Sequence, residues 1–241
     1  MIVYGRNAVA EALRGRRPVV RVWATPRARA AGLEGTTDGD GPLSLAEVVS
    51  AEEIERLCGS PDHQGLCADA GDYPYADPDA LLQPPDALVV CLDQVQDPRN
   101  LGAVCRVAEC AGATGVVIPE RRAAQVTPAA CRASAGAVEH LAVARVGNLT
   151  GFLGRAKEAG AWCYGAAADA RLDYLEPDWR GRVALVLGGE GRGLRPRVAG
   201  ACDALVSLPL RGRVGSLNVS TAAAALAYGI LHAREGVDRT G

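Results

Sequence analysis

Four glycines within six positions follow an apolar run in the C-terminal half of this 241-residue chain: Gly188, Gly189, Gly191 and Gly193. Residues without a Cβ let a ligand approach the backbone amides closely. The spacing G-x-G-x-G differs from the dinucleotide fingerprint, and no Gly-Lys-Ser/Thr follows as in a phosphate-binding loop. Because Glu190 would repel a pyrophosphate, the loop favours an uncharged or cationic ligand. A tight turn that needs positive φ is the alternative interpretation.

A second polar cluster opens an alanine-rich stretch. Ser216, Asn218 and Ser220 alternate there with the apolar residues Leu217 and Val219, just after a basic glycine loop. Any one of the three polar residues could cap the N-terminus of a helix. One residue is enough for a cap, so three of them around two apolar residues indicate a site.

The third candidate segment is a polar loop that leads into an apolar run. Asn100 stands where a helix N-cap is expected, and Gly102 allows another segment to come close. Arg106 interrupts the apolar run. A lone arginine there could simply lay its aliphatic stem along the surface. A functional one would supply a fixed positive charge.

Over residues 87–241, apolar runs alternate with helical patterns and must position these three segments. Nearly all-apolar strands between helices predict an α/β fold with a parallel sheet that is covered on both faces. The expected strands are 87–92, 115–118, 141–146, 162–166, 183–187 and 204–208, and the expected helices are 101–111, 128–135, 149–159, 195–201 and 217–233.

The N-terminal third predicts a separate small α/β domain over residues 1–71. Residues 72–86 contain four prolines and predict an extended linker to the domain at 87–241. Within the small domain we expect helices at 7–14 and 45–58, strands at 19–24 and 65–70, and a glycine-rich loop at 32–41.

Composition narrows the class of protein. Apolar residues make up 49% of the chain, enough for a packed core, and no run reaches the roughly 18 apolar residues of a membrane span. The N-terminus lacks the apolar segment of a signal peptide, so we expect a cytoplasmic location. The eight cysteines and three histidines show none of the close pairs typical of zinc ligands. We therefore expect reduced, buried thiols and no metal.

The charges are unevenly distributed, although the net charge of −2 does not itself indicate nucleic-acid binding. Residues 1–30 hold seven arginines and one glutamate, whereas residues 31–80 hold one arginine and twelve acidic residues. A basic edge beside an acidic segment could guide an RNA backbone. Solvated surface charge explains the same pattern equally well.

Taken together and in their order along the chain, the three segments resemble the motifs of the SpoU/TrmH branch of the SPOUT RNA methyltransferases. The matching stretches are Asn100-Leu-Gly-x3-Arg106, Leu187-Gly-x-Glu-Gly-x-Gly193 and Leu208-Pro-x5-Gly-Ser-Leu-Asn-Val-Ser220. Near the N-terminus, Val3-Tyr-Gly-Arg-Asn-Ala-Val9 and His63-Gln-Gly65 are similar to the small substrate-binding domain of the RlmB-type 23S rRNA guanosine methyltransferases. That domain has an L30e/L7Ae-like fold.

This resemblance implies a C-terminal SPOUT methyltransferase domain with a trefoil knot, and a homodimer with its site near the subunit interface. It implies that a ribose 2′-oxygen of RNA, most simply of 23S rRNA, attacks the methyl group of S-adenosyl-L-methionine. The cofactor would lie bent in the knot. The residues implied to bind it are Leu187, Gly188, Gly189, Gly193, Leu208, Pro209, Leu217 and Asn218.

The motif match also implies catalytic residues, namely Asn100, Arg106, Glu190, Ser216 and Asn218. Because arginine stays protonated, we expect Arg106 to stabilise the developing alkoxide and to hold an adjacent phosphate rather than to act as a base. The proton would pass to a substrate phosphate or to water. Asn100 would orient Arg106 or the ribose, and Glu190 would hold the arginine or a backbone amide. Ser216 and Asn218 would order their own loop against the cofactor and the ribose.

Four arginines are candidates for contacts with RNA phosphates: Arg6, Arg192, Arg211 and Arg213. They could equally be exposed loop residues. Gly189 departs from the family pattern, which often has Ser or Ala at this position, and we expect the difference to cost rigidity rather than activity.

Three other functions fit part of the pattern. A tRNA ribose methyltransferase would carry the same motifs, although a separate N-terminal module favours rRNA. A catalytically silent RNA-binding protein has no need of the intact Asn100, Arg106 and Glu190. A nucleotide-dependent oxidoreductase would need the fingerprint spacing and an acidic residue about 20 positions further on, and the sequence has neither.

Overall fold

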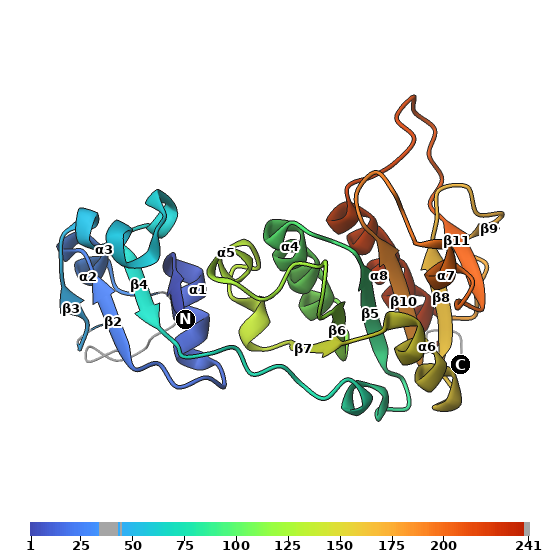
Figure 1. Ribbon diagram of the computed structural model, residues 1–241, viewed down its shortest axis with the longest axis horizontal. Helices are drawn as coiled ribbons and strands as arrows, with labels where there is room; N and C mark the ends of the chain where they lie inside the picture. Colours follow the sequence, from blue (N-terminus) through green and yellow to red (C-terminus); the bar gives the residue numbers. More distant parts are fainter. Residues whose placement is uncertain (34–42, 44, 239–241) are drawn as a thin grey trace.

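The computed structural model describes residues 1–33, 43 and 45–238 (Figure 1). Its larger part is a seven-stranded sheet in the order β7-β6-β5-β10-β8-β11-β9, in which all neighbouring strands run parallel. The strands are β5 (Leu88–Asp93), β6 (Gly115–Pro119), β7 (Ala142–Val146), β8 (Trp162–Ala166), β9 (Leu172–Asp173), β10 (Val183–Gly188) and β11 (Ala204–Ser207).

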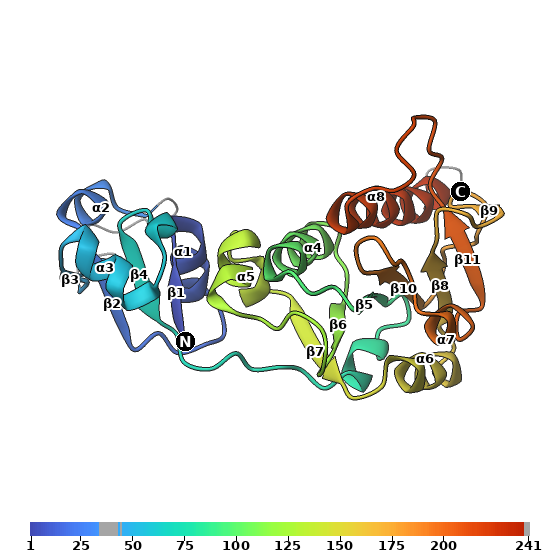
Figure 2. The same cartoon turned by 45° about the horizontal axis from the view of Figure 1, so that its top comes forward.

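Helices cover both faces of this sheet (Figure 2). One face carries α4 (Pro98–Cys110) and α8 (Val219–Asp238), with α5 (Pro128–Ala133) and the 3-10 helix η3 (Ala137–Glu139) beside α4; the other carries α6 (Leu149–Glu158) and α7 (Pro196–Ala199). On β5, Val90 and Leu92 pack in the core beneath α4 and α8, whereas Val89 and Cys91 pack in the core with α6. The predicted α/β class with a doubly covered parallel sheet is therefore confirmed.

The start of α4 differs from the prediction. The N-cap is Asp97, whose side chain accepts a hydrogen bond from the backbone N–H of Arg99, and Pro98 occupies the first helical position. Proline is favoured there because its φ is already helical and its missing N–H would be unpaired anyway. Asn100 as the N-cap was therefore wrong, and its side chain is free to bond elsewhere.

A four-stranded sheet in the order β1-β4-β2-β3 forms the small N-terminal unit. Its β1–β4 and β4–β2 pairs are antiparallel and its β2–β3 pair is parallel. The elements are β1 (Ile2–Tyr4), α1 (Arg6–Arg14), β2 (Arg21–Ala24), α2 (Pro26–Ala31), β3 (Glu47–Val48), α3 (Ala51–Cys58), η1 (Pro61–His63) and β4 (Leu66–Asp69).

The helix expected over residues 45–58 is wrong in its first six positions. Ser50 caps α3 by accepting a hydrogen bond from the N–H of Glu53, and Glu47–Val48 pairs with β2 as a short strand. A serine cap sets the helix start more firmly than the apolar pattern before it does. Most of the glycine-rich loop expected at 32–41 lies outside the described residues.

The expected linker is extended, but it packs along the larger unit instead of standing free. The hydroxyl of Tyr73 donates to the carbonyl of Val138 at 2.8 Å, and Ala76 forms a bridge with Ala144 of β7. Further along, η2 (Asp79–Leu82) buries two leucines against the sheet.

The small unit docks end-on against the larger one, through β1 and α1 on its side and α5 and η3 on the other (Figure 1). All eight cysteines are free thiols, and five of them are buried. Within the described ranges, no helix combines the length and apolarity needed to cross a membrane.

Candidate functional site

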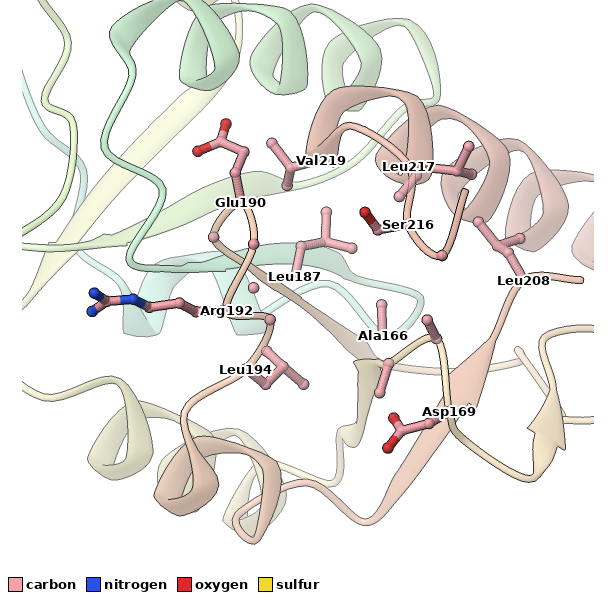
Figure 3. Close-up of a pocket in the computed structure, with 18 of the residues that line it drawn as sticks. Ala166, Asp169, Leu187, Glu190, Arg192, Leu194, Leu208, Ser216, Leu217 and Val219 are labelled. Atoms are coloured by element: carbon pink, nitrogen blue, oxygen red, sulfur yellow. The ribbon is translucent and has the colours of Figure 1, made fainter. Parts of the chain in front are cut away.

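A cavity of about 810 Å³ opens beyond the carboxyl ends of β8, β10 and β11 (Figure 3). Three loops and the start of α8 line it, which brings together segments that are far apart in the sequence. Crevices at the carboxyl ends of parallel strands are where open α/β sheets bind ligands. The lining includes Leu187, Gly188, Gly189, Glu190, Arg192, Gly193, Leu208, Ser216, Leu217 and Asn218, all of which the sequence singled out.

The glycine loop after β10 folds back on itself. The N–H of Gly193 donates to the carbonyl of Gly189 at 3.1 Å, and a Cβ on Gly188 would lie only 2.1 Å from the carbonyl carbon of Gly193. Gly191 and Gly193 adopt positive φ. The loop therefore combines a tight turn with close backbone contact.

Gly189 is tightly enclosed. A Cβ there would come within 2.5 Å of the carbonyl oxygen of Gln94. Gln94 itself has a φ of 61°, which is uncommon for a residue other than glycine. In this chain the loop thus lies closer to the backbone after β5 than a Ser or Ala at position 189 would permit.

An ion pair between a buried carboxylate and an arginine side chain that is 45% exposed anchors the other side of the loop. Asp93, at the end of β5, is fully buried and accepts hydrogen bonds from the backbone N–H of Arg195 at 2.8 Å and from its Nε at 2.7 Å. The carbonyl of Asp93 also accepts from the N–H of Gly189. The sequence analysis did not identify this pair, although an acid that ends an apolar strand was its available signal.

Asn100 links its own segment to the glycine loop and to the start of α8 by side-chain hydrogen bonds. Its Nδ2 donates to Oε1 of Glu190, and its Oδ1 accepts from Nδ2 of Asn218 at 3.2 Å. Asn218 in turn caps α8, because its Oδ1 accepts from the N–H of Ser220 at 2.9 Å. The fold therefore brings together three of the predicted catalytic residues. Glu190 and Asn218 line the cavity, as does Ser216, whereas Asn100 does not line it.

Arg106 is not part of this group. It lies on α4, exposed, and lines a second cavity between the two units instead of the large one. Arg192 lies at the rim of the large cavity with its guanidinium directed away from the interior (Figure 3). Arg211 and Arg213 are exposed in the projecting loop after β11.

Two further predicted residues lie outside the large cavity. Pro209 is exposed and does not line it. Arg6 is half-buried in the small unit, where its guanidinium donates to the carbonyl of Gly32 at 2.5 Å.

The cavity also contains residues that the sequence analysis missed. Asp169, in the loop after β8, lines its floor, and Ala166 and Leu194 add apolar wall (Figure 3). No motif marked Asp169, because only the fold brings the loop after β8 beside the glycine loop. The carboxylates of Asp169 and Glu190 suit a ligand with positive charge.

A cavity of this size in an α/β fold, next to interlinked polar side chains, is typical of a protein that binds a small-molecule ligand or cofactor. The model of the SpoU rRNA Methylase family matches residues 87–228, and the model described as RNA 2'-O ribose methyltransferase substrate binding matches residues 2–76. YacO of Bacillus subtilis (strain 168), named as a TrmH family tRNA/rRNA methyltransferase, is 36% identical over 98% of this chain and 96% of its own length. The chain belongs to the SpoU/TrmH family of RNA 2′-O-ribose methyltransferases.

Solved structures show how far the likeness extends. An rRNA methyltransferase from Sinorhizobium meliloti has a TM-score of 0.77 and 25% identity over 98% of this chain and 86% of that chain. An rRNA methyltransferase from the same organism has also been solved with AdoMet bound, and it has a TM-score of 0.77 to this chain. A protein from a study of the 2-OH methylation of C/U34 on tRNA has a TM-score of 0.57 and 25% identity, and covers 62% of this chain and 97% of that chain.

Proposed function

We propose that the protein transfers the methyl group of S-adenosyl-L-methionine to the 2′-hydroxyl of a guanosine in 23S rRNA, as the RlmB-type enzymes do. The observation that carries this proposal is the Asn218–Asn100–Glu190 hydrogen-bonded chain beside the large cavity. It links polar side chains from three motifs next to the cavity, which supports a position for the ribose beside a bound cofactor.

The residues of the cavity fit S-adenosyl-L-methionine. Its volume of about 810 Å³ lies in the usual range for cofactor sites. Leu187, Leu208 and Leu217 offer apolar wall for an adenine ring, and Asp169 offers a carboxylate for a cationic group. When bound, the cofactor supplies a methyl group on a sulfonium, which is already a good leaving group.

The chain's own residues must orient the hydroxyl. With Glu190 accepting from its Nδ2 and Asn218 donating to its Oδ1, Asn100 is fixed in one amide orientation. A side chain held from both ends can position a ribose with little loss of entropy at the moment of reaction. Ser216 contributes a hydroxyl to the same wall.

Arg106 has a narrower role in this proposal than the sequence suggested. Because Arg106 lies outside the cavity lining, we assign it to a phosphate of the RNA substrate. We do not propose that it stabilises the alkoxide in the cavity of its own chain. Guanidinium groups bind phosphate oxygens through charge-assisted, often bidentate hydrogen bonds.

Ribosomal RNA is favoured over tRNA by the small N-terminal unit. The S. meliloti rRNA enzyme covers 98% of this chain, whereas the tRNA-related protein covers 62%. The additional unit gives the enzyme a second surface for a large, folded substrate. RNA of that kind is recognised mainly by shape and by splayed nucleotides.

A homodimer in the cytoplasm is also part of the proposal. Val214, Leu217 and Tyr228 are large apolar residues that are 74%, 45% and 45% exposed on the loop after β11 and on α8. Apolar groups gathered near one helix are typical of an interface. The trefoil knot stays an expectation.

The test is methyl transfer from tritiated S-adenosyl-L-methionine to total RNA from cells that lack the corresponding methylase. The proposal expects label in 23S rRNA, at one site that resists alkaline cleavage, and recovery of 2′-O-methylguanosine after digestion. Label in tRNA would overturn the choice of substrate. A protein that binds the cofactor but labels no RNA would support the silent RNA-binding alternative.

A further inference from the structure

A second cavity, of about 360 Å³, lies between the two units. We call it the inter-unit cleft. The small unit contributes Tyr4, Asn7 and Asp62 to its walls, and the larger unit contributes residues of α4 and of α5 with the turn that follows, namely Arg99, Arg106, Ala129, Arg132, Ala133 and Ala135. Its side chains thus carry three positive charges and one negative charge.

Helix α4 connects this cleft to the cofactor cavity. Arg99 and Arg106 are seven residues apart, which is close to two helical turns, so they lie on one face of the helix. Asn100 points to a different face, where it bonds Glu190 beside the large cavity. A strand of RNA with one ribose at Asn100 would therefore meet these arginines with a neighbouring nucleotide.

The arginines of the cleft are available for a ligand. Among the described residues no carboxylate forms an ion pair with Arg106 or Arg132, and the Nε of Arg132 donates only to the backbone carbonyl of Asp62, at 3.4 Å. Arg99 pairs with Asp97, but its side chain is 80% exposed. Exposed pairs of this kind contribute little free energy, so a phosphate can replace the carboxylate.

The small unit packs directly against one of these arginines. The side chain of Arg132 lies over Gly5, where a Cβ would come within 2.6 Å of its Cδ. Gly5 also has a φ of 91°, which favours glycine. The cleft therefore has a defined shape to which both units contribute.

We propose that the inter-unit cleft binds the phosphodiester backbone of the RNA substrate next to the methylated nucleotide, through Arg99, Arg106 and Arg132. This inference rests on the proposed function, and it makes the junction between the units, in addition to the small unit itself, a part of the RNA-binding surface. Asn7 on α1 would contribute hydrogen bonds from the opposite wall.

The experiment measures the binding constant K for in vitro transcribed 23S rRNA at KCl concentrations from roughly 50 to 300 mM, a range over which phosphate contacts give a clear salt dependence. Replacing an arginine that contacts a phosphate lowers the slope of log K against log [salt] by about 1. The double variant Arg99→Gln/Arg132→Gln is therefore expected to lose about 2 in slope. Its KM for RNA should rise about tenfold or more, while kcat at saturating RNA and cofactor affinity stay within about threefold.

The matched control is Arg180→Gln. Arg180 forms the same local pair with Asp178, two residues before it, as Arg99 forms with Asp97, but it lies outside the cleft. A second variant, Asn7→Glu, places a negative charge on the opposite wall without touching α4, and should raise the KM for RNA. Gln83→Glu, an exposed change elsewhere, is its control.

Slopes and KM values equal to those of the controls, for both variants, would overturn the inference. The wild-type protein methylating 23S rRNA in the same series would then leave the proposed function intact. If the wild type methylates no RNA, the proposed function fails, and the salt slopes still decide whether the cleft binds an RNA backbone.

Discussion

Arg17 of the small unit and Glu139 of η3, 122 residues apart in the sequence, form an ion pair that is buried between the two units. The side chains are 2% and 1% exposed, and Nε of Arg17 donates to Oε2 of Glu139 at 2.9 Å. Burial alone would lower the pKa of Arg17, but the hydrogen bonds and charge of Glu139 outweigh it and raise that pKa. The pair holds the small unit against η3, which follows α5 in the chain.

Glu139→Gln is expected to destabilise the protein strongly, because it leaves the Arg17 guanidinium buried without a counter-charge. Breaking a buried pair from one side costs about 3–5 kcal/mol, whereas replacing both partners by apolar residues is often close to neutral. Urea denaturation followed by tryptophan fluorescence measures the effect. Arg17→Met/Glu139→Met should recover most of the loss, and Asp178→Asn, in an exposed pair, should leave the midpoint unchanged. A midpoint for Glu139→Gln that matches the wild type would contradict this account.

Gly188→Ala is expected to abolish cofactor binding while the fold persists. The new methyl group would meet the backbone of Gly193 and Leu194 within 2.4 Å, and backbone cannot move aside as a side chain can. The glycine loop would open and the cavity would lose its shape. Isothermal titration with S-adenosyl-L-methionine measures this. Gly154→Ala on α6 is the control, because a Cβ there meets nothing within 4 Å and Gly154 does not line the cavity. Equal affinity in the two variants would show that the loop tolerates displacement.

Asp169→Asn should weaken S-adenosyl-L-methionine binding about tenfold, since a charge-assisted hydrogen bond contributes roughly 1.5–3 kcal/mol. The carboxylate lines the cavity floor, where it would face a cationic group of the ligand (Figure 3). S-adenosylhomocysteine lacks the sulfonium charge, so comparing the two ligands tells whether Asp169 faces the sulfonium or the amino-acid end. Glu158→Gln removes an exposed charge on α6 and should change neither affinity.

We expect the buried and the exposed cysteine thiols to differ strongly in their reactivity toward an alkylating reagent. Burial raises the pKa of Cys67, Cys105, Cys131 and Cys163 to about 12, so almost no thiolate forms at pH 8. Burial raises the pKa of Cys110 as well, but this residue is exposed. Iodoacetamide followed by mass spectrometry should label Cys110 first and the buried cysteines only after unfolding. Early labelling of Cys105 would mean that α4 opens in the native protein.

Six of the seven strands and most helices of the larger unit follow from its apolar runs, because strands that are buried on both faces carry few polar residues. The two-residue strand β9 was not predicted, since no apolar run marks it. Two helices begin at other residues than expected, because their capping residues determine where they start. Asp97-Pro98 starts α4 three residues before the expected cap, and Ser50 starts α3 well after the apolar pattern begins. Both capping signals are visible in the sequence, so these two helix starts are predictable from local residues.

Contacts between residues that are far apart in the sequence do not follow from the apolar pattern or from helix caps. Asn100 meets Glu190 and Asn218 across 90 and 118 residues, and only their membership of three motifs suggested that they lie together. Asp169 and the Arg17–Glu139 pair belong to no motif, so nothing in the sequence marks them. The position of Arg106 could not be predicted either, because the orientation of a helix face depends on what packs against it.

The hydrogen-bonded chain at Asn100 allows a test by charge exchange. Asn100→Asp removes the donor to Glu190 and brings two carboxylates together, so we expect kcat to fall by about 10²–10³, as for loss of a positioned donor in other active sites. Asn100→Asp/Glu190→Gln restores complementary groups, since the amide introduced at position 190 would donate to the carboxylate introduced at position 100, to which Asn218 still donates. The double variant should therefore recover at least tenfold over Asn100→Asp, with the KM for RNA little changed throughout. If the double variant is instead as slow as the product of the two single losses, Asn100 and Glu190 act independently and the hydrogen bond between them does not position the ribose.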